Sequence, residues 1–483
     1  MLFNSVDFAI FLPLTFLFYW YVFNKNVKIQ NAFLFIISYF FYGFWDWRFL
    51  SLILFSTIVD FVIGIRISNE TKILNRKFLL WISILVNIGF LGVFKYYDFF
   101  VQNFINIFTL FGESFSISSF NIVLPVGISF YTFQTLSYTI DIYKRKLEPT
   151  KDFISFAAFV SFFPQLVAGP IERATNLLPQ FYISRVFNYK KSTDGIRQIL
   201  WGLFKKLVIA DNCAIFVDNI FNNYSTLSGS SLLFGALFFS FQIYADFSGY
   251  SDIAIGTSRL FGFELKQNFA FPYFSRNIAE FWRRWHISLS TWFRDYIYIP
   301  MGGSKVNSIK KIFNVMTIFT ISGFWHGANW TFIFWGLINA LFFLPLILFS
   351  KNRSYTDIVA KDKILPSFSD LSKILITFTI TALIWVLFRS QNLSQAFEIY
   401  STIFSLSLFE IPNFSVIGNG TLLEIILIIL FFIIVEWIGR DSLHALEKIY
   451  DLNKFFRYLM YFILFLLIIS FSGGSKSFIY FQF

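Results

Sequence analysis

The sequence predicts an all-α integral membrane protein that crosses the bilayer many times. Of its 483 residues, 56% are hydrophobic and 14% are charged, against roughly 25% charged residues in soluble domains. The mean hydropathy is +0.64, and 73 residues are phenylalanine. A spanning helix needs about 20 mostly apolar residues, and windows close to that length recur along the chain. The composition therefore excludes a soluble protein. The lipid bilayer is its expected surrounding, and no nucleic-acid partner is expected.

The apolar windows follow one another in the order of the chain. The clearest are Val6–Phe23, Asn31–Trp45, Phe49–Ile65, Phe78–Phe94, Val123–Tyr143, Ile374–Phe388, Leu422–Trp437 and Tyr458–Phe471. The first window has no basic leader and no small-residue cleavage site, which indicates a retained helix rather than a signal peptide. We expect one membrane domain over residues 1–483. Its expected parts are N-terminal helices at 1–150, a core with broken and interfacial helices at 151–345, C-terminal helices at 346–471 and an aromatic tail at 472–483.

The charges of the loops predict the orientation. If the N-terminus lies outside the cytoplasm, the first three inner loops carry ten Lys and Arg residues, and the outer segments carry only Arg48 and Lys95. Loops with an excess of Lys and Arg lie on the cytoplasmic side. We therefore expect an extracytoplasmic N-terminus, with Lys144–Lys151 inside.

Two polar motifs interrupt the apolar pattern. FFPQLVAGPIER (Phe162–Arg173) contains two prolines and a glycine, which predicts either a re-entrant turn or a kinked helix ending at the interface. Broken backbone at membrane depth must be buried in protein or line a watery cavity. QIYADFSGYSDIAIG (Gln242–Gly256) places Asp246, Tyr250 and Asp252 between apolar runs. These side chains either line a functional cavity, or the carboxylates pair with a nearby arginine.

A basic, tryptophan-rich stretch follows at Ser275–Gly303. Its aromatic residues recur at helical spacing, which predicts one amphipathic helix in the plane of the interface. From Arg259 to Lys311 there are nine Lys and Arg residues and three acids, which is +6 of the chain's net charge of +11. This surface either anchors lipid headgroups or attracts a phosphate-bearing donor or an acidic carrier protein. The candidate donor-binding residues are Arg283, Arg284, Lys310 and Lys311.

Two of the three histidines are candidates for chemistry. His326 lies within SGFWHGANW, between two apolar runs, and His286 lies in the basic stretch. Desolvation penalises the imidazolium ion, so an apolar setting keeps the ring neutral and able to accept a proton from a hydroxyl. Because ionisable groups inside a membrane are costly, we interpret His326 as a general base. Gly323 and Gly327 have no side chain, which predicts room for another group to approach His326 closely. For His286, catalytic and structural roles stay open.

Other kinds of site find no support. The histidines and the single cysteine, Cys213, lack the local spacing of a zinc site. Glycine fingerprints for flavin or nicotinamide are absent from the sequence, and so is a phosphate-binding loop. We therefore expect no bound metal or cofactor. We expect Cys213 to pack as a small apolar residue.

The chain resembles the membrane-bound O-acyltransferase family in four stretches: FFPQLVAGPIER, QIYADFSGYSDIAIG, WRRWHISLSTWFRDYIYIP and GFWHGANW. The likeness is to its bacterial cell-envelope branch, which includes alginate and peptidoglycan O-acetyltransferases and the D-alanyl transfer protein of teichoic acids. The resemblance implies about 11–13 membrane helices, some re-entrant or interfacial, around a central tunnel. It implies that His326 is catalytic and that His286 is the second signature histidine. Candidate tunnel-lining residues are Asp246, Tyr250, Asp252, Trp325 and Asn329.

The resemblance also implies a reaction and its partners. An acyl group, expected to be acetyl, moves from a cytoplasmic thioester donor, either acetyl-CoA or an acyl carrier protein thioester, to an extracytoplasmic polysaccharide or cell-wall polymer. The protein is expected in the bacterial inner membrane, beside a secreted or membrane-tethered acyltransferase partner. D-Alanyl transfer to a teichoic-acid-like polymer is an alternative. A non-enzymatic polysaccharide exporter would also have broken helices, but such proteins often have two related halves, and none is visible here.

The last residues, SGGSKSFIYFQF, form an aromatic tail with Tyr480 near its end. One interpretation is an interfacial aromatic anchor, a common use of tyrosine at membrane boundaries. The other follows from a resemblance to the aromatic-tyrosine C-terminal motif of envelope acylation systems. In that case the hydroxyl of Tyr480 carries the acyl group between donor and final acceptor, after His326 accepts its proton.

Overall fold

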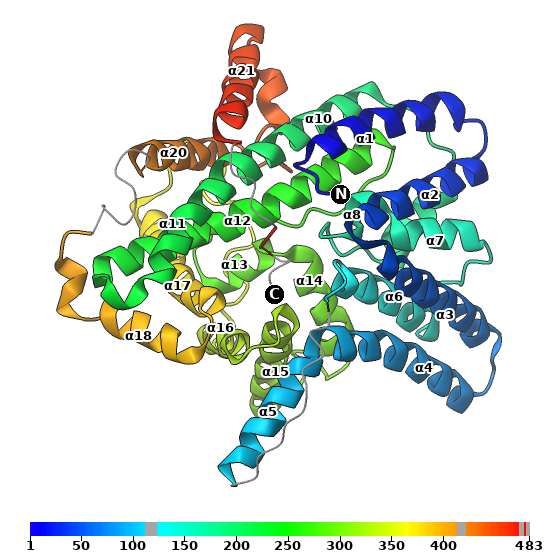
Figure 1. The fold of residues 1–483 in the computed structure, drawn as a ribbon, viewed down its shortest axis with the longest axis horizontal. Coiled ribbons are helices and arrows are strands. Elements are labelled where there is room, and N and C mark those ends of the chain that lie inside the picture. The colour runs from blue at the N-terminus through cyan, green and yellow to red at the C-terminus, as the bar shows by residue number, and fades with distance from the viewer. Residues whose placement is uncertain (112–122, 413–421, 473–477, 480–483) are drawn as a thin grey trace. The chain divides into compact units, whose positions relative to one another are not determined.

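The computed structural model describes residues 1–111, 123–412, 422–472 and 478–479. Over these residues the chain is helical and contains no β-strand, as predicted (Figure 1). It forms two compact units: Met1–Ser192 with Thr257–Lys266, and Thr193–Gly256 with Gln267–Phe483. The first unit thus includes a second segment, Thr257–Lys266. The predicted parts of the chain, with boundaries at 150, 345 and 471, stay predictions.

The helices of the first unit coincide with the early apolar windows. They are α1 (Val6–Leu17) with the wider turn η1 (Phe18–Val22), α2 (Val27–Asp46), α3 (Leu50–Asn69), α4 (Ile73–Leu91), α5 (Tyr97–Leu110), α6 (Ile128–Tyr143) and α7 (Phe153–Ser161). Helices α3, α4 and α6 pack on one another, and α2 packs on α7 (Figure 1). Asp60 is fully buried between α3 and α4, where it accepts hydrogen bonds from Ser83 at 2.6 Å and Asn87 at 2.9 Å. These bonds offset the cost of burying its carboxyl group.

The motif FFPQLVAGPIER is a break in the interior of the first unit. Helix α7 ends at Ser161, α8 (Phe163–Leu166) makes one turn, and the next helical turn, α9 (Ala174–Leu177), begins after the motif. Residues 162–172 are all buried, so this backbone is not a kinked helix ending at the interface. Glu172 is fully buried and accepts the backbone N–H of Lys266 at 2.5 Å. This bond ties the returning segment to the unit.

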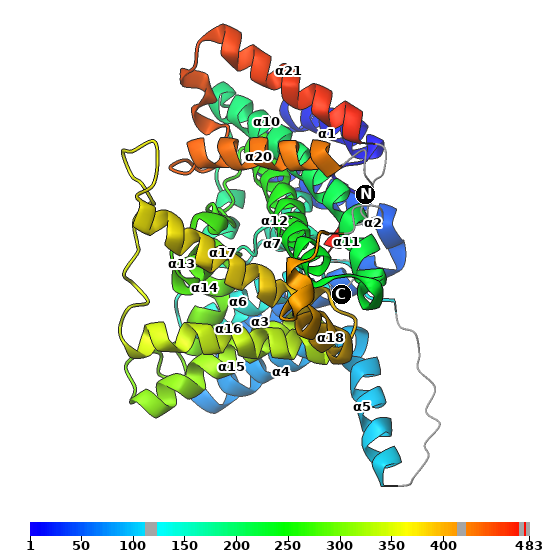
Figure 2. The same ribbon diagram turned by 90° about the vertical axis from the view of Figure 1, so that its left-hand side faces the viewer.

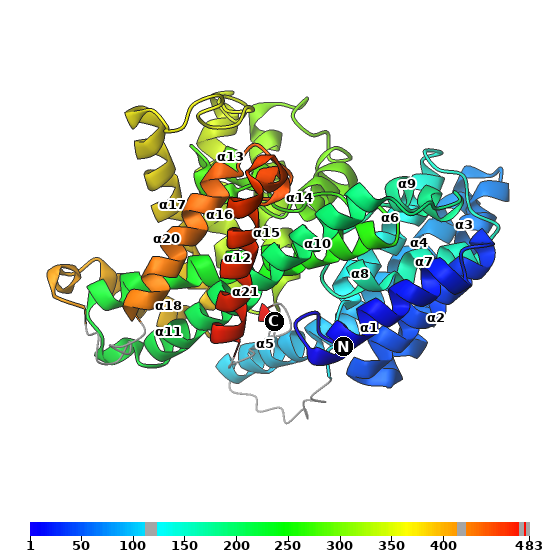
Figure 3. The same cartoon turned by 90° about the horizontal axis from the view of Figure 1, so that it is seen from above.

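The second unit begins where two helices touch through glycines. Helix α10 (Tyr189–Leu203) continues as the π-helix η5 (Phe204–Ala210) and then as α11 (Asp211–Asn222), and α10 and η5 run beside α12 (Gly229–Leu260) (Figure 3). A Cβ at Gly249 would lie 2.8 Å from the carbonyl oxygen of Gly202, and one at Gly256 would lie 2.4 Å from that of Gly195. Both distances are shorter than van der Waals contact. The two glycines of QIYADFSGYSDIAIG therefore allow the backbones to meet.

The predicted amphipathic helix over Ser275–Gly303 is wrong as one element. The structure has two short helices, α13 (Ile278–Arg284) and α14 (Ile287–Phe293), followed by the π-helical turn η8 (Arg294–Tyr298). The break falls at His286, whose φ of 43° is left-handed. Spacing alone does not reveal such a break, because each half keeps the same apolar face. Phe281, Trp285, Leu289 and Trp292 are all buried.

The remaining helices of the second unit are a packed group of three and the helices that follow it in the chain. Helix α16 (Trp330–Leu348) packs between α15 (Ser308–His326) and α17 (Phe368–Arg389) (Figure 2). Helix α18 (Leu393–Ile403) follows, and α20 (Leu422–Ile438) and α21 (Lys454–Phe471) both pack against η5. Gly323 and Gly336 permit the close α15–α16 packing, because a Cβ on either would lie 2.2 Å from a carbonyl oxygen of the other helix. The predicted space beside His326 is thus partly filled by α16.

The described residues contain six stretches that are long and apolar enough to cross a membrane. They are Val27–Asn69, Ile73–Leu110, Gly229–Leu260, Trp330–Leu348, Phe368–Arg389 and Lys454–Phe471, with the shorter apolar stretch Val6–Val22 beside them. The protein is therefore a multi-pass membrane protein. The stretches selected by length and composition are fewer than the 11–13 predicted helices. Two of them, Val27–Asn69 and Ile73–Leu110, each contain two α-helices, and α20 is 17 residues long.

Candidate active site

A cavity of about 440 Å³ in the second unit contains both candidate histidines. It lies among α13, α14, α15, α16 and the residues that follow α16. Half of the lining side chains are aromatic or aliphatic, and the other half are polar: Arg283, His286, Ser290, Thr291, Arg294, Ser322, His326, Asn352 and Arg353. Protein sites for small ligands usually combine an apolar wall with a few convergent polar groups. The cavity has both kinds of group and is more polar than this usual composition.

His286 is fixed in the cavity wall by Asn268. Its Nδ1 atom lies 3.1 Å from Asn268 Oδ1. The same oxygen accepts the backbone N–H of Ser288 at 3.2 Å and the Ser288 hydroxyl at 2.8 Å. Backbone bonds complete the loop, because Ile287 N–H donates to Asn268 O and Ala270 N–H donates to Arg284 O, both at 2.9 Å. The left-handed backbone at His286 is held in this way, as strained residues at functional sites usually are.

These bonds determine the tautomer of His286. A backbone N–H can only donate, so the Asn268 atom that accepts from Ser288 must be the oxygen. His286 Nδ1 therefore carries the hydrogen, and Nε2 keeps its lone pair. Nε2 is buried and makes no hydrogen bond among the described residues. His286 lies outside the apolar spanning stretches, and burial lowers its pKa to about 3. The ring is neutral at physiological pH and presents an acceptor.

His326 ends α15 and is surrounded by aromatic rings. It is 4% exposed, and its ring centroid lies 4.8 Å from Trp325, 5.1 Å from Trp335 and 5.3 Å from Phe388. Trp325 also lies 6.1 Å from His286. The indole ring is thus next to both histidines. The wall beside His326 is apolar, as the sequence predicts for this residue.

The cationic residues of the cavity differ from those predicted. Arg283 lines it and donates to the carbonyl oxygens of Asn352 and Tyr355. Arg294 and Arg353 line it too, and neither was among the candidate donor-binding residues. The other predicted cations, Arg284, Lys310 and Lys311, do not line it. Arg284 instead pairs with buried Glu280 at 2.8 Å, and both lysines lie in the first turn of α15.

The acidic residues of α12 form buried ion pairs instead of lining the histidine cavity. Lys206 Nζ lies 2.8 Å from Asp246 and 2.6 Å from Asp211. Lys205 Nζ lies 2.6 Å from Asp252, which also accepts a hydrogen bond from Gln198 at 2.8 Å. The partners are lysines and not the arginine considered from the sequence. Carboxylates at this depth are expected to be paired, so these residues have a structural explanation.

The other candidate lining residues also lie outside the cavity wall. Tyr250 packs on Phe478, with ring centroids 4.8 Å apart. Asn329 caps α16 by accepting the N–H of Thr331, and its amide donates to Gln391 O at 2.8 Å. Trp325 contacts the histidines without itself being part of the lining. Tyr480 lies outside the described residues, so its role stays a prediction.

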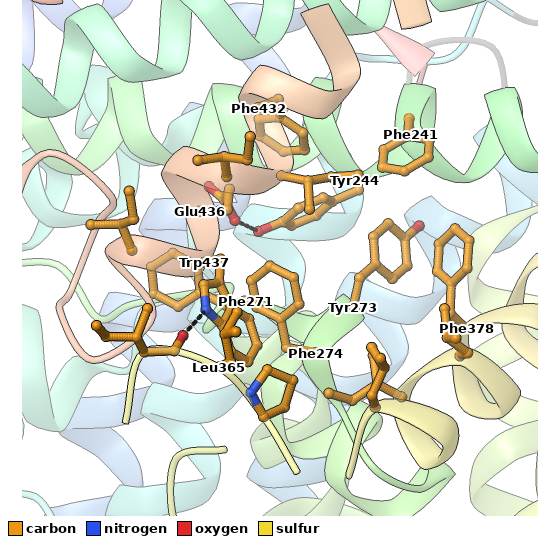
Figure 4. A pocket seen from close by; sticks show the side chains of 18 residues that line it. Phe241, Tyr244, Phe271, Tyr273, Phe274, Leu365, Phe378, Phe432, Glu436 and Trp437 are labelled. Carbon is orange, nitrogen blue, oxygen red and sulfur yellow. Dashed lines mark hydrogen bonds between the residues drawn. The ribbon is translucent and has the colours of Figure 1, made fainter. Parts of the chain in front are cut away.

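A second cavity, of about 580 Å³, is almost entirely apolar (Figure 4). Its polar groups are already bonded: Tyr244 donates to Glu436 at 2.6 Å, and the Trp437 indole donates to Ile364 O at 2.8 Å. No histidine, lysine or arginine belongs to its described lining. The candidate histidines and the candidate cations therefore do not belong to this cavity. Cys213 is fully buried elsewhere in the unit and packs as an apolar residue.

Sequence reasoning missed three residues of the site. Asn268 precedes His286 in the chain, and Arg294 and Arg353 follow it. Arg294 was within the predicted basic surface, but charge alone does not separate it from its neighbours. Asn268 and Arg353 belong to segments without an apolar period, so no helix pattern placed them near a histidine.

Comparison with known proteins identifies the family of the chain. The model of the membrane-bound O-acyltransferase family matches residues 146–388, a segment that includes both cavity histidines. The probable alginate O-acetylase AlgI of Pseudomonas aeruginosa is 37% identical over 442 residues, covering 89% of this chain and 81% of that protein. The peptidoglycan O-acetyltransferase of Helicobacter pylori is 37% identical over 428 residues, covering 83% and 79%.

A more distant similarity covers part of the chain. The teichoic acid D-alanyltransferase of Bacillus subtilis is 29% identical over 250 residues, which are 49% of this chain and 62% of that protein. The family match covers half of the chain, and the relatives above 30% identity cover most of it. The chain belongs to the membrane-bound O-acyltransferase family and is an O-acyltransferase.

Proposed function

We propose that this enzyme takes an acetyl group from a cytoplasmic thioester and delivers it for O-acetylation of an extracytoplasmic cell-envelope polymer, with His326 as general base. The observation that carries the proposal is the histidine cavity, whose lining includes His286, His326 and three arginines. Relatives named as alginate and peptidoglycan O-acetylating enzymes support the acyl group and the class of acceptor.

The proposed reaction is a transfer between sulfur and oxygen. His326 accepts the proton of an acceptor hydroxyl while that oxygen attacks the thioester carbonyl. The new C–O bond forms, the C–S bond breaks, and the departing thiolate takes the proton from the imidazolium ion. The aromatic wall around His326 excludes water, which limits hydrolysis of the donor and strengthens the ion pair of the intermediate.

We assign His286 a different part, which follows from its tautomer. Its Nε2 atom can accept a hydrogen bond but has no hydrogen to donate, because Nδ1 carries it toward Asn268. His286 would therefore orient a donor or acceptor N–H or O–H group. It would not protonate the leaving thiolate, because its pKa is too low for it to hold a proton at neutral pH.

The arginines of the cavity suggest the chemistry of the donor. Acetyl-CoA and the phosphopantetheine arm of a carrier protein both bear phosphate, and arginine is well suited to bind phosphate. Arg283 keeps its predicted role, and Arg294 and Arg353 take the place of Arg284, Lys310 and Lys311. The described lining includes no carboxylate. A D-alanyl thioester carries an ammonium group, which three arginines would repel, so the cavity favours acetyl over D-alanyl.

The remaining parts of the proposal concern location and partners. We place the enzyme in the bacterial inner membrane. Its N-terminus would lie outside the cytoplasm, because the first inner loops carry most of the Lys and Arg residues. A secreted or membrane-tethered partner would complete transfer to the polymer. The tail would act as the relay through Tyr480. This division lets the donor stay on the cytoplasmic side of the membrane.

The test uses the purified full-length enzyme with labelled acetyl-CoA and an acetylated carrier protein. His326→Gln should lower acetyl discharge by about 10²–10⁴-fold, the usual contribution of a general base. His444→Gln is the matched control, because the third histidine is bonded to Asp194 and does not line the histidine cavity. Near wild-type discharge by a folded His326→Gln protein would refute the assignment. If the wild-type enzyme discharges neither thioester, the proposed donor is wrong.

A further inference from the structure

The C-terminal segment is held to α12 through its backbone. Phe478 and Ile479, the described residues of the tail, are each 2% exposed. The N–H of Ile479 donates to Asp246 Oδ2 at 2.6 Å, a buried bond between residues 233 positions apart. The Phe478 ring lies 4.8 Å from Tyr250 and 5.9 Å from Phe247. This part of the tail is therefore in the protein interior and not in the membrane interface.

Asp246 is suited to hold a peptide N–H in the interior. Its Oδ1 atom lies 2.8 Å from Lys206 Nζ, so the lysine compensates its charge, and Oδ2 accepts from the tail. Hydrogen bonds to an ionised carboxylate are roughly twice as strong as neutral ones. If the tail left, Oδ2 would lose this bond in a buried site, and an unmade bond there is costly.

A neighbouring pair provides a comparison within the same helix. Asp252 also lies on α12 and also pairs with a buried lysine, Lys205. However, its second oxygen accepts from Gln198 of α10. That pair is completed by the helices themselves, whereas the pair of Lys206 and Asp246 is completed by the tail.

The described part of the tail is linked to the histidine cavity by one ring, that of Phe247. Phe247, which contacts Phe478, also packs edge-on against His286 with ring centroids 4.6 Å apart. His286 lines the cavity. We propose that Asp246 is a positioning residue, which with Lys206 as counter-ion latches the C-terminal segment beside the catalytic cavity. This inference rests on the proposed function, to which it adds a fixed place for the tail during acyl transfer.

The latch is tested by hydrogen–deuterium exchange of the C-terminal peptide, measured by mass spectrometry on the full-length protein in lipid nanodiscs. Asp246→Ala should speed exchange of the Ile479 amide by about 10- to 100-fold, the equilibrium equivalent of one charge-assisted bond. Asp252→Ala is the matched control, because it opens the neighbouring pair without touching the tail, and it should leave the exchange rate unchanged.

A second pair of variants tests the same bond from the other side. Ile479→Pro deletes the N–H donor and leaves both ion pairs intact. Proline has no amide hydrogen, so the Phe478 amide is measured instead, and it should exchange faster. This variant tests the latch even if Asp246→Ala does not fold. Ile479→Val keeps the donor and should behave as wild type. A wild-type Ile479 amide that exchanges at the rate of an unstructured peptide overturns the latch. Unchanged exchange in a folded Asp246→Ala protein also overturns it.

Kinetics separate a positioning role from a structural one. Asp246→Ala should lower kcat of acetyl transfer by the same factor of about 10 to 100, with the donor KM unchanged, because the arginines that would bind the donor are elsewhere. A fall in kcat with unchanged exchange would refute the latch as its cause. If exchange follows the expected pattern but the wild-type enzyme transfers no acetyl group, the proposed function fails and the latch stands.

Discussion

The tautomer of His286 leads to a prediction about Asn268. The substitution Asn268→Asp keeps the shape of the side chain and the oxygen that accepts from His286 and Ser288. The second oxygen replaces the amide that donates to Ser251 Oγ at 3.2 Å, and the Ser251 hydroxyl can rotate to donate instead. The hydrogen bonds are therefore retained. The substitution adds a negative charge beside Nδ1 of the buried His286 ring.

The size of the effect follows from the distance and the burial. An opposite charge at this range raises the pKa of its partner by about 1–3 units, which is about 1.4–4 kcal/mol in favour of the imidazolium ion. Burial sets the wild-type pKa of His286 at about 3, so the variant should titrate between about 4 and 6. Protonation removes the Nε2 lone pair. Activity should therefore be lost as the pH falls through the new pKa and recovered above it.

The assay is a pH–rate profile of acetyl transfer between about pH 4 and pH 8, which spans the titration expected for the variant. The wild-type enzyme should show no inflection from His286 in this range, and Asn268→Asp should gain one on the acid side. Gln267→Glu is the control, because it adds the same charge one residue away, where the side chain bonds to Leu443 O. A folded Asn268→Asp enzyme with the wild-type profile would refute the tautomer and the acceptor role of Nε2.

Three further predictions follow from the site and its frame. Replacing Arg294 and Arg353 by alanine should raise the donor KM and weaken its dependence on salt, whereas Lys310→Ala should change neither in initial-rate assays. Tyr480→Phe should abolish polymer acetylation and leave a well-folded protein, and full acetylation would show that the tail is only an anchor. Gly323→Leu should lower the thermal unfolding midpoint, because its side chain would collide with the Phe332 carbonyl at 2.2 Å; an unchanged midpoint would contradict the packing described for α15 and α16.

The sequence predicted the helices well because a membrane imposes one simple rule. Backbone groups in lipid must bond within their own segment, so each long apolar window becomes a helix, as at α2, α3, α6, α17 and α21. His326 was accessible to the same reasoning, since an ionisable side chain between two apolar runs is conspicuous. The structure places His326 at the end of α15 in the lining of the histidine cavity, and its role as a base stays a prediction.

The details that depend on tertiary contacts were not accessible. The break at His286 is held by Asn268, which is distant in sequence and lies in an irregular segment. The carboxylates of α12 were expected either to line a tunnel or to pair with an arginine. Their partners are Lys205 and Lys206, which lie on a π-helix. A π-helix shifts which side chains face inward, and the periodicity of an α-helix cannot predict that shift.

Both cavity histidines lie where a helix stops, and this has a physical reason. Inside a helix a side chain lies along the surface of the preceding turn, whereas His326 ends α15 and His286 separates α13 from α14. Each ring can therefore enter the space between helices.

The cavity around the two histidines has charged arginines in its lining and indole and phenyl rings beside His326. A charged phosphate is most stable near the arginines, and an uncharged thioester is the part of the proposed donor that tolerates the apolar wall. The distribution of polarity in the cavity would thus orient the donor with its reactive carbonyl toward His326.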